Sequence, residues 1–232
     1  MTDPLTLSTH CPPDAPGLMP LLRCAGRWFN EIELNTPMAD SVTSFIQRRF
    51  LQAYGAEPKL RIPSLLALTT AQGSLIAATG VRNASRERLF LEDYLSAPVE
   101  NLLPVSGVGR NGIAEIAHMA GVEAGVSRYL FTCLSVWLNA EGYEWVVCTS
   151  TVQLSNGFHR LGIPTHVIDR ADPARLPDGG NDWGRYYEQR PMVIAIRIQD
   201  AIDALRKKGI LNLVQTVSMA EPGDTVMNGG GL

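Results

Sequence analysis

The sequence predicts one α/β domain in which helices cover a twisted sheet of mixed strand pairing. Short apolar and β-branched runs alternate along the chain with segments of helical periodicity, which is typical of this class. Two neighbouring apolar runs, at 64–69 and 74–81, are separated by a short turn and indicate a hairpin. Hydrophobic residues make up 45% of the 232 residues and charged residues 19%, which is enough for a good core.

The first 25 residues are expected to form an irregular arm, because prolines block helix and central strand alike. These prolines are Pro4, Pro12, Pro13, Pro16 and Pro20. Residues 27–34 (RWFNEIEL) can form a strand, expected at an edge of the sheet. Thr36 and Pro37 mark the start of a helix over 38–54, and Gly55 is expected to end it. Its predicted apolar face consists of Val42, Phe45, Ile46, Phe50 and Leu51.

The rest of the chain alternates between predicted strands and helices. Residues 87–95 form a short helix or an irregular segment, and residues 171–184 are rich in loops. Strands are predicted over residues 113–120, 144–151, 163–168 and 192–198. Helices are predicted over residues 126–140, 152–161 and 200–208. Residues 26–210 therefore make up a single domain, and residues 211–232, with their glycine run, are expected to be a flexible tail.

The net charge and the cysteine content restrict the possible partners, metals and cellular location. The net charge of −3 provides no general attraction to nucleic acid or to an anionic membrane, so neither is an expected partner. The four cysteines lack the spacing of a metal site, so no metal is expected, and apolar surroundings at Cys133 and Cys148 indicate buried thiols. No signal-peptide pattern and no apolar run near the roughly 20 residues of a spanning helix occurs, so stable membrane insertion is not expected and the cytoplasm is the expected location.

The stretch from Asn111 to Arg128 carries most of the candidate chemistry. Its first half is an apolar strand interrupted by two ionisable groups, Glu115 and His118. Three positions apart, these side chains do not share a strand face unless a bulge intervenes. One interpretation is a proton acceptor for an amine nucleophile, either a carboxylate with a raised pKa or a neutral imidazole. The alternative is that Glu115 pairs with an arginine such as Arg82 and that the hydrogen bonds of His118 are satisfied at the sheet edge.

The second half of this stretch is a turn that leads into a helix. Gly121 and Gly125 precede the first helical turn, which carries Ser127 and Arg128. Free backbone N–H groups and the positive end of the helix dipole make such a turn a seat for an anion. The spacing matches no specific phosphate-binding motif, so the alternative is that the glycines only shape the turn.

A further candidate is the aromatic loop at residues 183–187 (WGRYY). Trp183 and Tyr187 are expected to wall a pocket for an apolar or planar substrate. The alternative is that this loop plugs the hydrophobic core.

Several sequence blocks resemble one bacterial family. They are RRFLQAYGA (48–56), GVRNA (80–84), LFLEDYL (89–95), PVE (98–100), IAEIAHMA (113–120), WVVCTST (145–151), NGFHRLG (156–162), ADPARL (171–176), WGRYY (183–187) and PMVIA (191–195). In this order they are similar to the thermostable hemolysin family, over roughly residues 38–200. That family resembles the GNAT-type N-acyltransferases, and among them the acyl-homoserine-lactone (autoinducer) synthases.

The resemblance implies a GNAT-like fold with splayed central strands. The donor's pantetheine arm would lie along strand 113–120 and its phosphate at the turn 121–128. The implied co-substrate is an acyl carrier protein with its phosphopantetheine, or acyl-CoA, rather than a bound cofactor, and the implied acceptor is a small-molecule amine. The glycine turn is a loose version of the GNAT pyrophosphate loop, which favours the carrier protein. The expected donor-binding residues are Ala117, Met119, Gly121, Gly125, Ser127, Arg128 and Asn156.

The resemblance also suggests which residues carry the chemistry. In autoinducer synthases a glutamate on this strand, an arginine three residues later and an arginine at the end of the preceding strand are functional. Glu115 and Arg82 match the first and the last. His118 stands where those enzymes carry arginine and where the hemolysin family commonly has asparagine. Glu115 and His118 are the expected catalytic residues, and the expected acceptor-binding residues are Arg82, Glu92, Trp183 and Tyr187.

Two departures from these relatives matter for the mechanism. The tyrosine that often serves GNAT enzymes as general acid corresponds here to Phe158, so another group or water must protonate the leaving thiolate. The acidic pair with which many autoinducer synthases engage their acceptor has no clear counterpart, so their acceptor is not carried over.

The expected function is therefore acyl transfer from a thioester to an amine, such as an amino acid or a biosynthetic intermediate. Two alternatives stay open. The family name suggests a membrane-active cytolysin, for which the sequence shows no clear insertion segment. The other is a protein that binds an acyl thioester without catalysis, since Phe158 and the loose glycine turn fit a loss of activity.

Overall fold

The computed structural model of the chain describes residues 9–12, 15–60, 62–122 and 125–217. The strands are β1 (Leu18–Cys24), β2 (Arg27–Ile32), β3 (Ser64–Thr69), β4 (Leu75–Asn83), β5 (Ile113–Gly121), β6 (Trp145–Ser150), β7 (His166–Arg170), β8 (Met192–Arg197) and β9 (Val214–Thr216). The α-helices are α1 (Pro37–Tyr54), α2 (Val126–Ala140), α3 (Val152–Leu161) and α4 (Ile198–Lys207). Short 3-10 helices connect them, among them η2 (Phe90–Tyr94), η6 (Asn181–Trp183), η7 (Tyr186–Gln189) and η8 (Ile210–Leu213).

The strands form one sheet in the order β7-β8-β6-β5-β4-β3-β2-β1-β9. Within the described part of the chain, β5 and β6 pair in parallel at the middle of the sheet, and the other neighbouring strands pair antiparallel. The parallel pair arises because α2 returns the chain between β5 and β6, so that both strands run in the same direction. This arrangement confirms the predicted α/β class with a mixed sheet.

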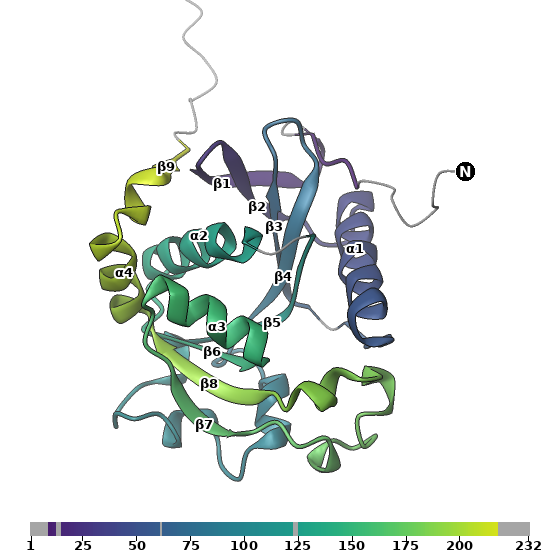
Figure 1. Cartoon of the computed structure of the whole chain (residues 1–232), viewed down its shortest axis with the longest axis vertical. Coiled ribbons are helices and arrows are strands. Elements are labelled where there is room, and N and C mark those ends of the chain that lie inside the picture. Colours follow the sequence, from purple (N-terminus) through teal and green to yellow (C-terminus); the bar gives the residue numbers. More distant parts are fainter. Residues whose placement is uncertain (1–8, 13–14, 61, 123–124, 218–232) are drawn as a thin grey trace, which may run out of the picture.

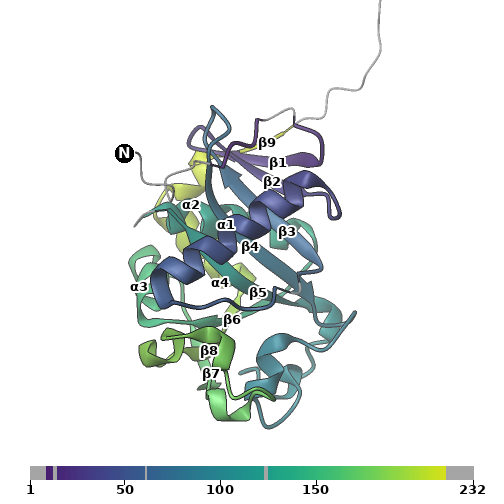
Figure 2. The same cartoon turned by 90° about the vertical axis from the view of Figure 1, so that its right-hand side faces the viewer.

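Helices cover both faces of the sheet. Figure 1 shows α1 on one side of the sheet and α2 on the other, and Figure 2 shows α1 crossing the strands diagonally. One hydrophobic cluster lies between α1 and the sheet, and a second lies between the sheet and the helices α2, α3 and α4. The two clusters explain why the strands near the centre are apolar on both faces.

The ends of α1 follow the sequence signals. The Thr36 hydroxyl accepts a hydrogen bond from the Ala39 amide at 3.2 Å, and Gly55 ends the helix in the left-handed region with φ of 64°. Of the predicted apolar face, Leu51 is the exception. It is 46% exposed, because it lies one position beyond the stripe that contacts the sheet.

Three predictions about the N-terminal region and the tail are wrong. The predicted irregular arm contains β1, where Pro20 is tolerated next to a register shift in the pairing with β2. β2 is therefore an inner strand and not an edge strand. Residues 214–216 of the predicted flexible tail form β9, which pairs with β1. The glycine run at 229–231 lies outside the described residues.

The boundaries of β7 and α4 also differ from those predicted. The strand predicted over 163–168 is β7 at 166–170, because Gly162 ends α3 in the left-handed region and Pro164 follows it at once. The last helix, α4, begins at Ile198 instead of Asp200. Its apolar residues Ile198, Ala201, Ile202 and Leu205 recur at helical spacing and are buried.

Candidate active site

A bulge in β5 lies at the centre of the candidate site. The register between β4 and β5 shifts opposite Thr79, so that His118 and Met119 on β5 face one residue of β4. His118 has a φ of 54°, in the left-handed region that few non-glycine residues adopt. A bulge of this kind redirects the side chains around it. As a result Glu115 and His118, although three positions apart, line the same cavity.

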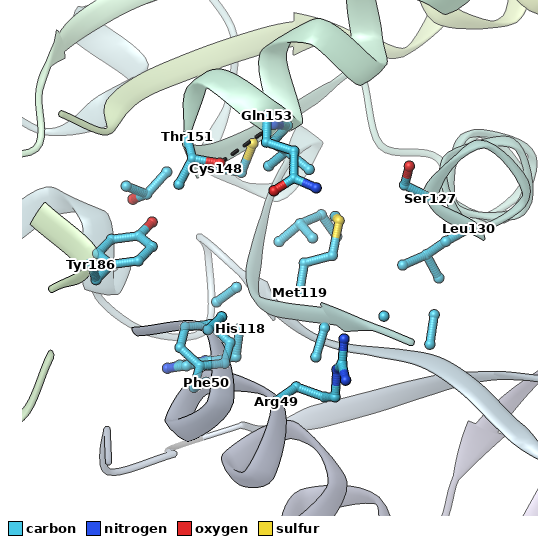
Figure 3. Close-up of a pocket in the computed structure, with 18 of the residues that line it drawn as sticks. Arg49, Phe50, His118, Met119, Ser127, Leu130, Cys148, Thr151, Gln153 and Tyr186 are labelled. Atoms are coloured by element: carbon cyan, nitrogen blue, oxygen red, sulfur yellow. Dashed lines mark hydrogen bonds between the residues drawn. The ribbon is translucent and has the colours of Figure 1, made fainter. Parts of the chain in front are cut away.

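The cavity opens where β5 and β6 part. Their parallel register runs from Ile113 opposite Trp145 to Ile116 opposite Cys148, although β5 continues to residue 121. Beyond that point a cavity of about 420 Å³ follows β5, lined also by α1, the start of α2, α3 and the loop around residue 183. Figure 3 shows the sides of this cavity, with Ser127 at the start of α2 and Gln153 on α3. The central strands are therefore splayed, as the resemblance implies.

The carboxylate of Glu115 is fully engaged by the protein. The Arg82 guanidinium donates to Oε2 at 2.9 Å, and the amides of Phe90 and Leu91 donate to Oε2 and Oε1, each at 2.9 Å. Burial raises the pKa of Glu115, while Arg82 and the two amides act against this shift and stabilise the charged form. The structure thus contains the Arg82–Glu115 pair that the sequence left open as an alternative, and the pair joins β4, β5 and the start of η2.

The imidazole of His118 faces the cavity in a very different environment. It stacks on the Trp183 ring, with centroids 5.9 Å apart and an interplanar angle of 17°. Its Nδ1 atom is buried and has no hydrogen-bond partner among the described residues. Burial, and in second place the positive charge of Arg82, lowers the pKa of His118 to about 4. At neutral pH the ring is therefore uncharged and holds one nitrogen that can accept a proton.

This lowered pKa predicts a pH dependence of stability. The unfolded chain binds a proton at His118 near its ordinary pKa of 6.5, whereas the folded chain does so only near pH 4. Above pH 6.5 His118 therefore does not reduce the free energy of unfolding. As the pH falls from 6.5 to 4, this residue lowers the free energy of unfolding by at most about 3 kcal/mol. Urea unfolding of the wild type and of His118→Asn at pH 7, 5.5 and 4.5 measures this loss of stability. We expect the difference between the two proteins to shift in favour of the variant on acidification, and a constant difference would contradict the assignment.

An aromatic wall forms the side of the cavity towards α1. It consists of Phe50, Tyr54, Phe90, Tyr94, His118, Trp183 and Tyr186. Neighbouring rings are in contact, with centroid distances between 5.2 and 6.4 Å. The sequence predicted Trp183 for this wall but placed Phe50 on the apolar face of the helix and gave Tyr54 no role, because helical spacing does not distinguish a core ring from a pocket ring. The predicted Tyr187 lies behind the wall, where its hydroxyl meets that of Tyr94 at 2.6 Å.

The opposite end of the cavity contains most of the residues predicted to bind the donor. Gly125 precedes α2 with φ of 95°, and Ser127 in the first turn lines the cavity together with Ala117, Met119 and Gly121. Arg128 is exposed and donates a hydrogen bond to the Tyr129 hydroxyl. Neither Arg128 nor the exposed Asn156 is among the described residues that line the cavity.

Two cations that sequence reasoning missed line the cavity instead. These are Arg49 of α1 and Arg160 of α3. Arg49 also donates to the Val122 carbonyl at 3.1 Å, just beyond the end of β5. No local signal marks these arginines, because their place in the site depends on how the helices pack.

Two predicted acceptor-binding residues have other partners in the structure. Arg82, already paired with Glu115, also lies 3.2 Å from the Glu87 carboxylate. Glu92 accepts hydrogen bonds from Arg110 and from the amides of Leu89 and Val99. Burial acts to raise the pKa of Glu92, but Arg110 and these amides lower it to about 2. Neither residue is among the described residues that line the cavity.

Phe158, at the position of the GNAT tyrosine, is part of the core. Its ring stacks on Phe131 with centroids 4.3 Å apart. The two helices approach closely there, because Gly157 has no side chain and a Cβ atom would lie 3.1 Å from the Phe131 ring. Phe158 is not among the described cavity residues.

The described residues include no group of three or more metal-ligating side chains and no helix that is long and apolar enough to cross a membrane. All four cysteines are buried and free, as predicted for Cys133 and Cys148.

A mixed sheet with a bulged, splayed central strand and a cavity at a helix N-terminus defines the GNAT-like fold, and solved structures agree. The apo form of TofI shares 15% sequence identity, with 77% of this chain and 95% of that chain covered and a TM-score of 0.53. The acyl-homoserine-lactone synthase LasI shares 10%, with 81% and 96% covered and a TM-score of 0.53. FeeM, an N-acyl amino acid synthase from uncultured soil microbes, shares 14%, with 78% and 99% covered and a TM-score of 0.52.

Sequence comparison defines the family more closely. The family model of the thermostable hemolysins matches residues 32–202, so the chain belongs to the thermostable hemolysin family. No curated protein sequence matches the chain. The family and the fold were both predicted from the sequence blocks described above.

Proposed function

We propose that the protein is an N-acyltransferase that moves an acyl group from a thioester, carried by an acyl carrier protein or by CoA, to an amine. The observation that carries this proposal is the cavity beside the part of β5 that extends beyond its pairing with β6, with the neutral His118 imidazole on its wall. In this cavity the edge of β5 that β6 leaves free can bind an extended chain, and His118 beside it can transfer a proton.

The donor is proposed to enter along β5. A pantetheine arm carries two amide groups, which can pair with backbone groups of residues 117–121 in the way that a peptide adds to a sheet edge. Its phosphate would then reach the N-terminal end of α2 near Ser127, where backbone N–H groups favour an anion. Arg49 and Arg160 add positive charge to the lining of the same cavity.

The proton is proposed to pass through His118. The amine nitrogen attacks the thioester carbon, and backbone N–H groups of β5 stabilise the oxyanion. The uncharged imidazole takes the proton from the nitrogen. The C–S bond then breaks, and the imidazolium, acidic because of its lowered pKa, returns the proton to the leaving sulfur. This path needs no tyrosine at position 158.

Glu115 has a positioning role in this proposal, in place of the proton-accepting role predicted from the sequence. Its carboxylate holds the first amides of η2 against β5 and neutralises Arg82. Phe90 and Tyr94, both on η2, are thereby fixed in the aromatic wall. A carrier protein as donor and the cytoplasm as location remain part of the proposal, and four free cysteines fit a reducing compartment.

Donor binding provides a first test. We expect Arg160→Glu to raise the dissociation constants of CoA and of phosphopantetheinylated carrier protein roughly tenfold or more, because a charge-assisted hydrogen bond contributes about 1.5–3 kcal/mol. Isothermal titration calorimetry measures these dissociation constants. Lys207→Glu, an exposed charge reversal on α4 that does not line the cavity, is the matched control. Equal affinities for the two variants would place the donor phosphate elsewhere.

A further inference from the structure

The cavity has two chemically distinct sides. Towards α2 and α3 its lining includes Ser127, Gln153 and Arg160, which are polar or charged. Towards α1 it is mainly the aromatic wall already defined, whose rings come from α1, η2, β5 and the segment from η6 to η7. Arg49 of α1 lies at the end of this side, where it donates to the Val122 carbonyl. If the donor occupies the polar side, as the proposed function requires, the amine acceptor must approach from the aromatic side.

The aromatic wall offers no free charge to an acceptor. Among the described residues that line the cavity, the charged ones are Arg49, Glu115 and Arg160. Both oxygens of Glu115 accept hydrogen bonds from the protein. The Arg49 guanidinium donates to the Val122 carbonyl beyond the end of β5, on the side assigned to the donor phosphate. A carboxylate placed against the wall would therefore lose its hydration without gaining a cation.

The same wall suits an amine. The faces of aromatic rings attract ammonium groups, and Phe50, Trp183 and Tyr186 meet at centroid distances of 5.2 to 6.3 Å beside His118. His118 lines the cavity beside these rings, and one nitrogen of its neutral imidazole is a hydrogen-bond acceptor for an amine N–H. Desolvation in such a site also favours the neutral amine, which is the nucleophilic form.

We propose that the acceptor is a primary amine on an aromatic or apolar body that carries no carboxylate or phosphate. This inference rests on the proposed acyl transfer, because that function assigns the polar side to the donor. It separates the protein from a synthase that acylates amino acids, whose acceptors carry a carboxylate next to the amine.

Binding of two matched probes tests the inference without any donor. 2-Phenylethylamine and L-phenylalanine differ in the carboxylate alone, and ligand-observed NMR or calorimetry measures their affinities for the full chain. We expect the amine to bind at least tenfold more tightly. Tyr54→Leu and Phe90→Leu, at two half-buried wall positions, are each expected to weaken its binding severalfold. Trp28→Leu, at a partly buried ring on β2 outside the cavity, should leave binding unchanged.

Binding of L-phenylalanine as tight as that of the amine, or no binding of the amine, overturns the inference. Turnover distinguishes this failure from a failure of the proposed function. Acyl transfer to L-phenylalanine but not to 2-phenylethylamine would contradict the acceptor class and leave acyl transfer standing. Specific binding of the amine without transfer from any thioester would contradict acyl transfer and leave the amine site standing.

Discussion

Replacing Glu115 by alanine is expected to lower the free energy of unfolding by about 3–5 kcal/mol. The carboxylate is 2% exposed and binds Arg82 and two backbone amides, so its loss removes one of the two carboxylates beside a buried guanidinium and the acceptor of two N–H groups. This cost is a large part of the stability of an ordinary domain. We expect Glu115→Ala to fold only marginally and to lose the order of η2.

Chemical denaturation followed by circular dichroism measures this effect. Asp203→Ala is the matched control, because it removes the carboxylate of an exposed ion pair with Arg206 on α4, where the expected change is at most about 1 kcal/mol. A loss of less than 1 kcal/mol for Glu115→Ala would show that the buried pair is not structural. The catalytic role predicted from the sequence would then regain support.

Replacing His118 by asparagine is expected to lower the rate of acyl transfer by about 10²- to 10⁴-fold, the range found when a proton-transfer group is removed. Asparagine adopts the left-handed backbone at least as readily as histidine, so the bulge with φ of 54° can persist. The substitution therefore removes the imidazole and keeps the geometry of β5. Single-turnover mass spectrometry of the acyl carrier protein measures the rate.

The melting temperature and the donor affinity of His118→Asn at pH 7 serve as controls, and both should stay close to those of the wild type. A variant that folds and binds donor normally yet transfers at the wild-type rate would remove His118 from the mechanism. That outcome would indicate a mechanism without a side-chain base at this position.

Much of the fold was predictable, because the apolar periods of α1, α2 and the central strands are strong local signals. The errors have physical causes. Pro20 concealed β1, since a register shift next to it makes its missing N–H tolerable. β9 is three residues long, and its place in the sheet comes from pairing with β1 and not from its own sequence.

The site was only partly predictable. Glu115, His118, Ser127 and Trp183 were found because they stand next to turn signals or break an apolar run, and the structure brings them into one cavity. Arg160 was missed because a cation on a helix face gives no signal of what lies opposite. The amides of η2 donate hydrogen bonds to Glu115, but η2 is distant from Glu115 in sequence. Local sequence patterns therefore could not decide whether Glu115 is a proton acceptor or a structural residue.

Acyl transfer at the cavity beside β5 can be measured on the unmodified protein. The most direct measurement is mass spectrometry of purified wild-type protein incubated with an acyl carrier protein or CoA thioester and a panel of amines. We expect loss of the acyl group from the donor and appearance of an N-acyl amine of matching mass, at a rate well above that of the donor and amine alone. Unchanged donor with every amine, or lysis of erythrocytes by the pure protein without any transfer, would contradict it.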